Sequence, residues 1–421
     1  MTKNPRRVRR ARAQLDLTPL DESRKRFFSA LEEVGFFTQA PSEELDVREA
    51  LGRVTAAPIK ARRPVPHFRS SAMDGIAVPS SQTQKARPDH PVRLRPDEDF
   101  IYVDTGDPVP EPFDAVIMIE QVEELDDGVV EISHAIDSNA NVRPVGEDFS
   151  LGALVVERGQ RMTPEGITAC LNAGILRLPI RKKMRALYIP TGSEIVSPDE
   201  EPALGEYPES NSQLFKGYLT SWGAEVAIAP IIKDLPDMIR KEVECGLTTS
   251  DLVAIAGGTS KGREDFTAEI VDELGRVLVH GVAYHPGHPI LLGLVHGKPV
   301  IGLPGYPVAA WLGLRQFVRP LIERYLGLTA SRPSTLWGRL AEEIRSQPGT
   351  RLFVRVRLEE TSEGYLIHPL RGGASRLSSL LQADGLLVVD EASESLRAGS
   401  PVTVELLRSP FSSNSFASHN P

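Results

Sequence analysis

A short segment that holds three of the chain's nine histidines is the first candidate for chemistry. It reads HGVAYHPGHP and places His280, His285 and His288 close together. Neutral imidazoles ligate metals, and protonated imidazoles donate hydrogen bonds to anions. A proline follows each of the last two histidines, which disfavours a helix, and the Pro-Gly pair between them predicts a type II turn with their Cα atoms within about 7 Å. A metal site, an anion site and an inert loop are all compatible with this pattern.

Three glycine-rich segments could bind an anion, because each follows an expected strand. They read PTGSE (190–194), AGGTSKGRED (256–265) and GLPGYP (302–307). Glycine lets backbone N–H groups approach a phosphate closely, and a helix that begins after the loop adds a favourable dipole. None of the three has the spacing of a P-loop or of G-x-G-x-x-G. The alternative is that these glycines serve only the tight turns between strands and helices.

Carboxylates lie in or next to the same loops. Glu194 is in the first loop, Glu264 and Asp265 are in the second, and Asp234 stands before an expected helix. Mg²⁺ favours one or two carboxylates together with phosphate oxygens, so acids beside phosphate loops predict a divalent cation. For Asp234 the alternative is an ordinary helix N-cap.

Other polar residues lie in loops nearer the N-terminus. Asp74 precedes Gly75 in SSAMDGIAV, Thr105 lies in YVDTGDPVP, and Asp148 lies in RPVGEDF. Taken singly, each is a turn residue, and Asp-Gly between apolar residues is a hairpin signal. The chain has no H-E-x-x-H, so this zinc-protease signature is not present.

The elements that would position these residues change in type along the chain. Residues 21–61 are expected to be helical, and residues 62–143 show short apolar runs between turn residues, which predicts a β-rich domain. Residues 144–182 are mixed, with a helix capped by Thr163 and ended by Gly174. We expect 144–182 to pack with 21–61 as one discontinuous domain into which the β-rich domain is inserted.

Residues 183–328 alternate strictly between apolar strands and amphipathic helices, which predicts a doubly wound α/β domain with a parallel sheet. Ligands of such sheets bind at the carboxyl ends of the strands, where the glycine-rich loops are. Residues 329–409 contain five short β patterns and predict a barrel or sandwich. The predicted fold class is therefore multidomain α/β, with residues 1–20 and 410–421 as disordered tails.

Charge and composition restrict the partners. The formal charge of −9 argues against bulk nucleic-acid or membrane binding, so an anionic ligand needs local donors. The N-terminal tail is the exception, with a targeting or RNA-contacting arm as the alternative to a plain disordered segment; its cations are Lys3, Arg6, Arg7, Arg9, Arg10 and Arg12. Two cysteines, Cys170 and Cys245, exclude a disulfide framework and fit a reducing cytoplasm. No apolar run reaches the ~20 residues that span a bilayer.

An ordered set of motifs carries a family resemblance. The segments SAMDGIAV, DTGDPVP, DAVIMIEQVE, RPVGEDF, PTGSEIV, AGGTSKGREDF, PGHP and GLPGYPVAA resemble, in this order, the molybdopterin molybdenumtransferase family, which includes MoeA and the E domain of gephyrin. The similarity runs from about residue 21 to residue 409. It implies a homodimer of four-part chains: a discontinuous domain, an inserted β domain, an α/β domain like that of molybdopterin adenylyltransferases, and a C-terminal β-barrel.

The resemblance also implies an activity and a site. Enzymes of this family insert molybdate or tungstate into adenylylated molybdopterin and release AMP, with Mg²⁺ required, in a cleft between the α/β domain of one subunit and the β domain of the other. By position, the implied catalytic residues are Asp74, Thr105, Asp148 and Glu194, and the implied Mg²⁺ ligands are Glu194, Asp234 and Asp265. The implied substrate-binding residues are Thr191, Gly192, Gly257, Gly258, Ser260, Gly262, His285, Gly287, His288, Pro304, Gly305, Arg355 and Ser375.

The chain departs from the family pattern at three places. Ser193 stands where the family usually has an acid, and Lys261 is added in the second glycine-rich loop. His285 and His288 stand where the family commonly has lysines, so two permanent cations become titratable. We therefore expect these histidines to hold an anion that binds more weakly from about pH 6 to pH 8. A carrier that binds molybdopterin without catalysis is the alternative function, and a scaffold for partner peptides is a more remote one.

Overall fold

The computed structural model describes residues 17–38, 40–257, 266–328 and 333–408. The chain forms two compact units. The small unit is Ser42–Arg181, and the main unit combines Met1–Pro41 with Lys182–Pro421. Within the described ranges, no helix combines the length and the apolar character needed to cross a membrane.

The first part of the small unit is built from segments far apart in the sequence. Strand β1 (Ser42–Asp46) pairs with β12 (Arg177–Arg181), and β2 (Ile59–Lys60) pairs with β11 (Leu154–Val156), all antiparallel. Helix α3 (Pro164–Asn172) begins as predicted, with the Thr163 hydroxyl accepting a hydrogen bond from the Gly166 N–H at 3.2 Å. The shared core contains Val47, Ile59, Val156, Cys170 and Leu178.

The predicted helix in residues 47–61 is wrong. Only Val47–Glu49 forms a short 3-10 turn; the chain then turns again at Leu51 and Gly52 and is extended at Val54 and Thr55. Thr55 bridges Ile180, and its hydroxyl donates to the Glu157 carbonyl at 2.6 Å. β-Branched Val54 and Thr55 next to Pro58 favour extended pairing over helix, and tertiary partners from residues 157–180 supply it.

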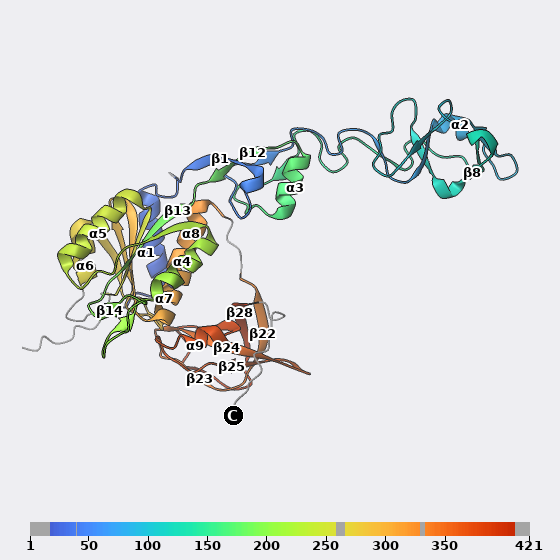
Figure 1. The fold of residues 1–421 in the computed structure, drawn as a ribbon. Helices are drawn as coiled ribbons and strands as arrows, with labels where there is room; N and C mark the ends of the chain where they lie inside the picture. The colour runs from blue at the N-terminus through green and yellow to red at the C-terminus, as the bar shows by residue number, and fades with distance from the viewer. Residues whose placement is uncertain (1–16, 39, 258–265, 329–332, 409–421) are drawn as a thin grey trace, which may run out of the picture. The chain divides into compact units, whose positions relative to one another are not determined.

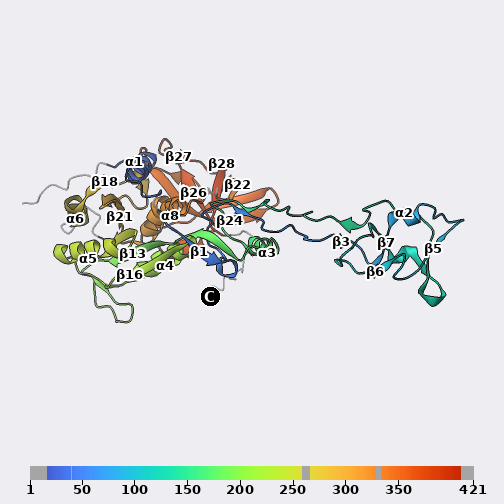
Figure 2. The same cartoon turned by 90° about the horizontal axis from the view of Figure 1, so that it is seen from above.

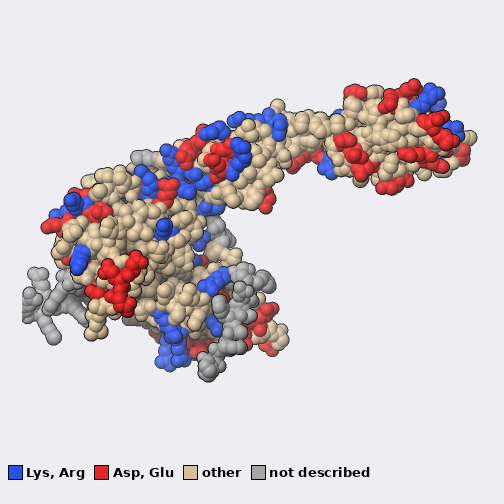
Figure 3. Space-filling view, in the orientation of Figure 1, with Lys and Arg blue, Asp and Glu red and all other residues tan. Residues whose placement is uncertain are grey.

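The rest of the small unit is the β-rich domain, and the prediction of short strands in residues 62–143 is confirmed. The first three-stranded antiparallel sheet contains β4 (Gly75–Val78), β6 (Ile101–Val103) and β7 (Ala115–Met118). The second contains β5 (Val92–Leu94), β8 (Val122–Glu124) and β9 (Val130–Ile132). A pair of short strands, β3 (Ser70–Ser71) and β10 (Val142–Arg143), also belongs to this domain. Short turns complete it: α2 (Ser80–Thr83), Ile119–Gln121 and Asp126–Gly128. Figure 3 shows Asp and Glu side chains spread over the drawn face of this domain.

The centre of the main unit is a six-stranded mixed sheet. Its order is β16 (Ala224–Ile228), β13 (Met184–Pro190), β17 (Leu252–Ala256), β21 (Lys298–Leu303), β20 (Leu291–Val295) and β18 (Arg276–His280). The first four are parallel, whereas β20 and β18 run antiparallel to their neighbours. The prediction of an all-parallel sheet is therefore wrong at this edge. A two-residue turn joins β20 to β21, with φ of +50° at His296 and +74° at Gly297, which is the geometry of a type I′ hairpin.

Helices cover both faces of this sheet, as the doubly wound prediction requires (Figures 1 and 2). One face carries α5 (Pro236–Thr249) and α6 (Phe266–Leu274), and its core includes Ile239, Val243, Val253 and Ile270. The other face carries α4 (Asn211–Trp222), α7 (Pro307–Gly313) and α8 (Arg319–Leu326), the last two joined by a π-helical turn, Leu314–Val318. A small arm, β14 (Ile195–Val196) with β15 (Tyr207–Pro208), precedes α4.

The first helix, α1 (Leu20–Glu33), lies in the main unit and packs on β18 and β20, whereas the sequence pattern predicts that residues 21–61 pack with 144–182. Its buried side chains include Leu20, Phe27 and Leu31, and the Phe27 ring packs edge-on against Phe317 of the π-helical turn. The apolar face of α1 is buried against the α/β domain, which explains why α1 does not pack with residues 144–182.

The C-terminal part is a closed barrel of the five predicted strands: β22 (Thr335–Leu340), β24 (Arg351–Thr361), β25 (Gly364–Pro369), β26 (Gly385–Val389) and β28 (Pro401–Leu406). The pairing of β24 with β26 closes the ring. A short helix, α9 (Ser378–Gln382), and a small pair, β23 (Ile344–Arg345) with β27 (Ser395–Leu396), complete it. Strand β19 (Tyr284–His285), from the α/β domain, pairs in parallel with β24.

Candidate functional site

The loops after β13, β17 and β21 meet at the carboxyl edge of the main sheet. Thr191 is buried, and its hydroxyl donates to the Ala256 carbonyl at 2.6 Å. The Gly257 N–H donates to the Leu303 carbonyl at 3.0 Å, which ties the second loop to the third. Gly257 has φ +92°, and a Cβ there would stand 3.0 Å from the Thr191 carbonyl oxygen, so this close approach needs glycine. The predicted convergence of Thr191, Gly257 and Pro304 at one edge is therefore present.

Part of the second loop lies outside the described residues. The predicted site residues Gly258, Ser260, Gly262 and Asp265 belong to this stretch, residues 258–265. Gly192, in the first loop, is described: its N–H donates to the Ile232 carbonyl at 3.1 Å, and a Cβ on it would come within 3.0 Å of the Glu194 carboxylate. The Glu194 side chain therefore folds back over Gly192.

Asp234 holds the first loop instead of capping helix α5. Its carboxylate accepts from the Ser193 N–H at 2.7 Å, and its own N–H donates to the Ser193 hydroxyl at 3.3 Å. Helix α5 begins after Leu235, without a side-chain cap, so the N-cap alternative is wrong. Ser193 directly precedes Glu194. The contacts between Ser193 and Asp234 therefore join the loops that carry Glu194 and Asp234, two of the three predicted Mg²⁺ ligands.

Carboxylates without a histidine or thiol are the ligand type that Mg²⁺ prefers, and two of them leave room for phosphate oxygens and water. Within the described part of the chain, no group of three His, Cys, Asp or Glu side chains is arranged to hold a metal by itself. The donor set of Glu194 and Asp234 fits a cation that shares its ligands with a phosphorylated substrate.

The histidine segment adopts a bend that differs from the predicted type II turn. The His285–Pro286 peptide bond is cis, Gly287 has φ +121°, and the two imidazole rings lie with centroids 5.5 Å apart. A Cβ on Gly287 would be 3.0 Å from the Tyr284 ring and 3.4 Å from the Ala309 carbonyl oxygen, so glycine is required here too. No third ligand among the described residues completes a metal site with the two rings.

The positive charge of Arg355, in β24, affects the protonation of His285. The Arg355 side chain is buried, its Nε donates to the Ser379 hydroxyl at 3.2 Å, and its Nη2 donates to the Gly372 carbonyl at 2.5 Å. Burial lowers the pKa of His285, and the positive charges of His288 and Arg355 lower it further. The structure therefore brings Arg355, which is distant in sequence, within electrostatic range of His285.

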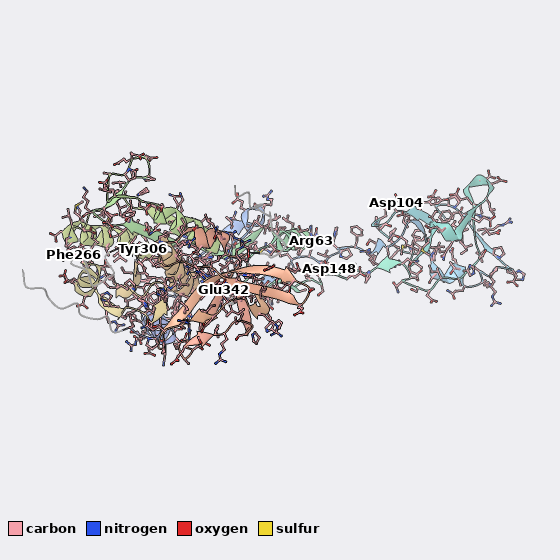
Figure 4. All side chains as sticks on the ribbon, turned by 90° about the horizontal axis from the view of Figure 1, so that it is seen from below. Arg63, Asp104, Asp148, Phe266, Tyr306 and Glu342 are labelled. Atoms are coloured by element: carbon pink, nitrogen blue, oxygen red, sulfur yellow. The ribbon has the colours of Figure 1, made fainter. Side chains whose placement is uncertain are left out.

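A loop of the barrel and the start of α7 complete this region. Ser375 is exposed on the loop of residues 371–376, and the Ala374 carbonyl accepts from the Val308 N–H at 3.0 Å. Gly305 is exposed, and the Asn211 side chain donates to its carbonyl at 2.7 Å. Tyr306 beside it is 62% exposed (Figure 4). The sequence patterns did not single out Asn211, although its position at the start of the helix after the first loop was a usable signal.

In the small unit, Asp74 and Thr105 form a direct contact. The Asp74 carboxylate accepts from the Thr105 N–H at 2.6 Å and from its hydroxyl at 2.8 Å, and these bonds lower the pKa of Asp74. Both side chains are exposed. The carboxylate is thus held in its ionised form at the surface.

The Asp-Gly pair is not a hairpin turn, because β3 and β4 pair with other strands. Gly75 is needed for another reason: a Cβ on it would be 1.9 Å from the Ile117 carbonyl oxygen of β7. Asp148 is exposed in the same unit, and its N–H donates to the Val65 carbonyl at 2.9 Å (Figure 4). The hydrogen bonds of the described residues do not link Asp148 to Asp74 or Thr105.

The fold is that of a multidomain α/β protein, in which glycine-rich loops meet at the carboxyl edge of the central sheet and a closed barrel follows. Comparison with protein families agrees. The sequence matches "MoeA N-terminal region (domain I and II)" over residues 18–174, "Probable molybdopterin binding domain" over 188–324 and "MoeA C-terminal region (domain IV)" over 338–407.

Individual relatives agree along nearly the whole chain. A protein of Methanocaldococcus jannaschii, provisionally named a molybdopterin biosynthesis protein, is 33% identical over 410 residues, 93% of this chain and 99% of its own. The molybdopterin molybdenumtransferase of Haemophilus influenzae is 29% identical over 399 residues, 92% of this chain and 98% of its own. The crystal structure of the molybdopterin biosynthesis MoeA protein of Pyrococcus horikosii superposes with a TM-score of 0.80 at 31% identity and covers 94% of this chain and all of its own. The chain belongs to the MoeA family.

Proposed function

We propose that this protein is a molybdopterin molybdenumtransferase, which inserts molybdate or tungstate into adenylylated molybdopterin and releases AMP during molybdenum cofactor biosynthesis. The observation that carries the proposal is the meeting of the Thr191, Gly257 and Pro304 loops at one sheet edge, with Glu194 and Asp234 beside them. The relatives that carry this name are about 29% identical to the chain.

The main unit would bind the substrate. The N–H groups of Gly192, Ser193 and Gly257 already donate within the protein, so the other donors of the glycine-rich loops would bind the phosphate oxygens. An acidic protein of net charge −9 needs such local donors in order to hold an anion. Glu194 and Asp234, together with Asp265, would hold Mg²⁺, which when bound offsets the charge of the pyrophosphate. His285, His288, Arg355 and Ser375 would bind the tetrahedral metal oxyanion, because the first three are cationic when protonated and the last donates a hydroxyl.

The small unit would supply the reactive carboxylates. Asp74, kept ionised by Thr105, is suited to orient a water or accept its proton as the adenylyl phosphate is attacked, and Asp148 supplies a further carboxylate. We propose a homodimer in which the small unit of one subunit serves the main unit of the other. With α1 assigned to the main unit, the proposed division of the chain is 42–61 with 144–182, 62–143, 183–328 and 329–409.

The direct test is an AMP-release assay. Purified protein with adenylylated molybdopterin, Mg²⁺ and molybdate should release AMP and yield molybdenum cofactor, and the release should depend on Mg²⁺. Light scattering of the same sample should give the mass of a dimer.

The second candidate is a carrier that binds molybdopterin without turnover. Ser193 favours it, because the acid usual at this position is replaced by a residue whose N–H and hydroxyl are both bound to Asp234. Tight substrate binding without AMP release, across a range of pH and of divalent metals, would establish the carrier and exclude the transferase.

A further inference from the structure

The imidazole pair has a defined donor geometry. The Nδ1 of His288 lies 3.3 Å from the Val282 carbonyl oxygen. A carbonyl can only accept, so this hydrogen bond fixes the proton on Nδ1 and leaves a lone pair on Nε2 in the neutral ring. An oxyanion near Nε2 is repelled by the neutral form, and it is bound only when a second proton converts Nε2 into a donor.

The bend that carries the pair is held rigidly. Tyr284 is fully buried, and its ring packs edge-on against Phe353 at 6.0 Å between centroids. Gly287 is enclosed between this ring and the Ala309 carbonyl, and Tyr284 pairs in register with Arg351 of the barrel. The two rings are therefore presented from a fixed backbone, so that ligand affinity depends on their protonation more than on rearrangement.

The charged groups around the pair are mostly cations. From β24, the charge of Arg355 lowers the pKa of His285, and among the described residues no carboxylate forms an ion pair with Arg355. Arg351 on the same strand is neutralised by Asp21 of α1 and by Glu391. Helix α7 carries no titratable side chain. Helix α1 contributes Arg24, β19 contributes Tyr284, and the barrel loop contributes Arg376 together with Arg371, which forms an ion pair with Glu342. A buried arginine without a carboxylate, next to two imidazoles, is an arrangement suited to an anion.

We propose that the His285–His288 pair binds the oxyanion substrate only together with protons, so that occupancy of the site is set by pH. The inference rests on the proposed function for the identity of the oxyanion. A tetrahedral dianion enters, one or two protons are taken up from solvent onto Nε2 of His288 and onto His285, and the same protons leave when the anion leaves. No bond other than N–H is made or broken in this step.

The sign of the effect follows from the protonation of His285 before the anion binds. Burial, His288 and Arg355 lower the pKa of His285 below its ordinary value, so the ring is neutral at pH 7 when no anion is present. A bound dianion reverses the electrostatic effect and raises the pKa. Affinity is then greatest at low pH and falls about tenfold per pH unit for each linked proton, between the pKa of the free site and that of the occupied site.

Titration calorimetry of the full-length protein with sodium molybdate or tungstate tests this directly. Between pH 6 and pH 8 the Kd should rise at least about tenfold. At pH 7, heats measured in two buffers of different ionisation enthalpy should reveal uptake of about one proton or more per anion. A Kd that is constant over this range, or binding without proton uptake, overturns the proposal.

Two double variants sharpen the test. His285→Lys with His288→Lys should bind molybdate with a Kd that is flat from pH 6 to pH 8, and His285→Gln with His288→Gln should bind weakly at both ends. The control is His368→Gln, which removes an imidazole bonded to Glu359 on the barrel surface and should keep the pH dependence of the native protein. A pH profile unchanged in the lysine variant contradicts the proposal.

The result of the molybdate titrations does not depend on whether the protein has transferase activity. Proton-linked binding of molybdate without AMP release would reject the proposed function and keep this inference. AMP release together with pH-independent molybdate binding would support the proposed function and reject this inference.

Discussion

The two groups of candidate site residues are built in different ways. In the main unit, backbone groups from three loops meet at a sheet edge, and glycines at 257 and 287 are required because neighbouring backbone or ring atoms would stand 3.0 Å from a Cβ at either position. In the small unit, an exposed side-chain pair, Asp74 with Thr105, lies in the loops next to strands β4 and β6. The first arrangement suits binding of a large anion, and the second suits a proton transfer or the orientation of water. Substitutions in the two units should therefore have separable effects.

The largest effect is expected from Asp74→Asn. The amide can still accept from Thr105, but the negative charge is lost, so AMP release should fall by about 10²–10⁴-fold while substrate affinity and thermal stability change little. A quenched-flow or steady-state AMP assay combined with calorimetry measures both. Asp104→Asn, an exposed neighbour on the same domain (Figure 4), is the matched control and should retain activity. Equal losses in the two variants would count against a role for Asp74 in the reaction.

Gly75→Ala should damage the fold rather than the chemistry. The new Cβ would stand 1.9 Å from the Ile117 carbonyl oxygen, so β4 and β7 must separate, at a cost of about 1–3 kcal/mol or more. Chemical denaturation measures the change in the free energy of unfolding. Gly217→Ala in the exposed part of α4 meets no atom within 4 Å and should stabilise the main unit by about 0.5–1 kcal/mol. A neutral Gly75→Ala would show that the β4–β7 contact is not needed.

Asp234→Ala should affect the metal requirement. It removes the acceptor of the Ser193 N–H and one of the proposed Mg²⁺ ligands, so the Mg²⁺ concentration at half-maximal AMP release should rise about 10–100-fold. Asp237→Asn, at an exposed position on α5, is the control. An unchanged Mg²⁺ dependence would leave Asp234 with only a structural role.

The smallest effect is expected in the pH dependence of stability. Because the pKa of His285 is lower in the folded protein than in the unfolded chain, folding is disfavoured as pH falls through the ordinary histidine range, near 6.5. The melting temperature without molybdate should therefore decrease from pH 7 to pH 6, and added molybdate should restore it. His285→Gln should reduce this decrease. An identical decrease in the variant would assign it to other groups.

Local patterns in the sequence predicted many elements correctly, because they depend on contacts between near neighbours. The five β patterns after residue 329 all form strands, and Thr163 caps its helix as expected. The strict alternation of residues 183–328 predicted the doubly wound arrangement, but the antiparallel edge was missed. Histidine is among the non-glycine residues that most often adopt a positive φ, so the His296-Gly297 pair was a usable signal for this hairpin.

The sequence by itself determined which residue types are present to bind an anion and a cation. Its ordered motifs also determined the family to which the chain belongs. The tertiary structure alone decided which of them meet. Asp234 reaches Ser193, Asn211 reaches Gly305, and β19 pairs with β24 so that Arg355 acts on His285. These contacts join residues 41 to 94 positions apart or connect separate domains, and they depend on how strands and helices pack, which no local periodicity encodes.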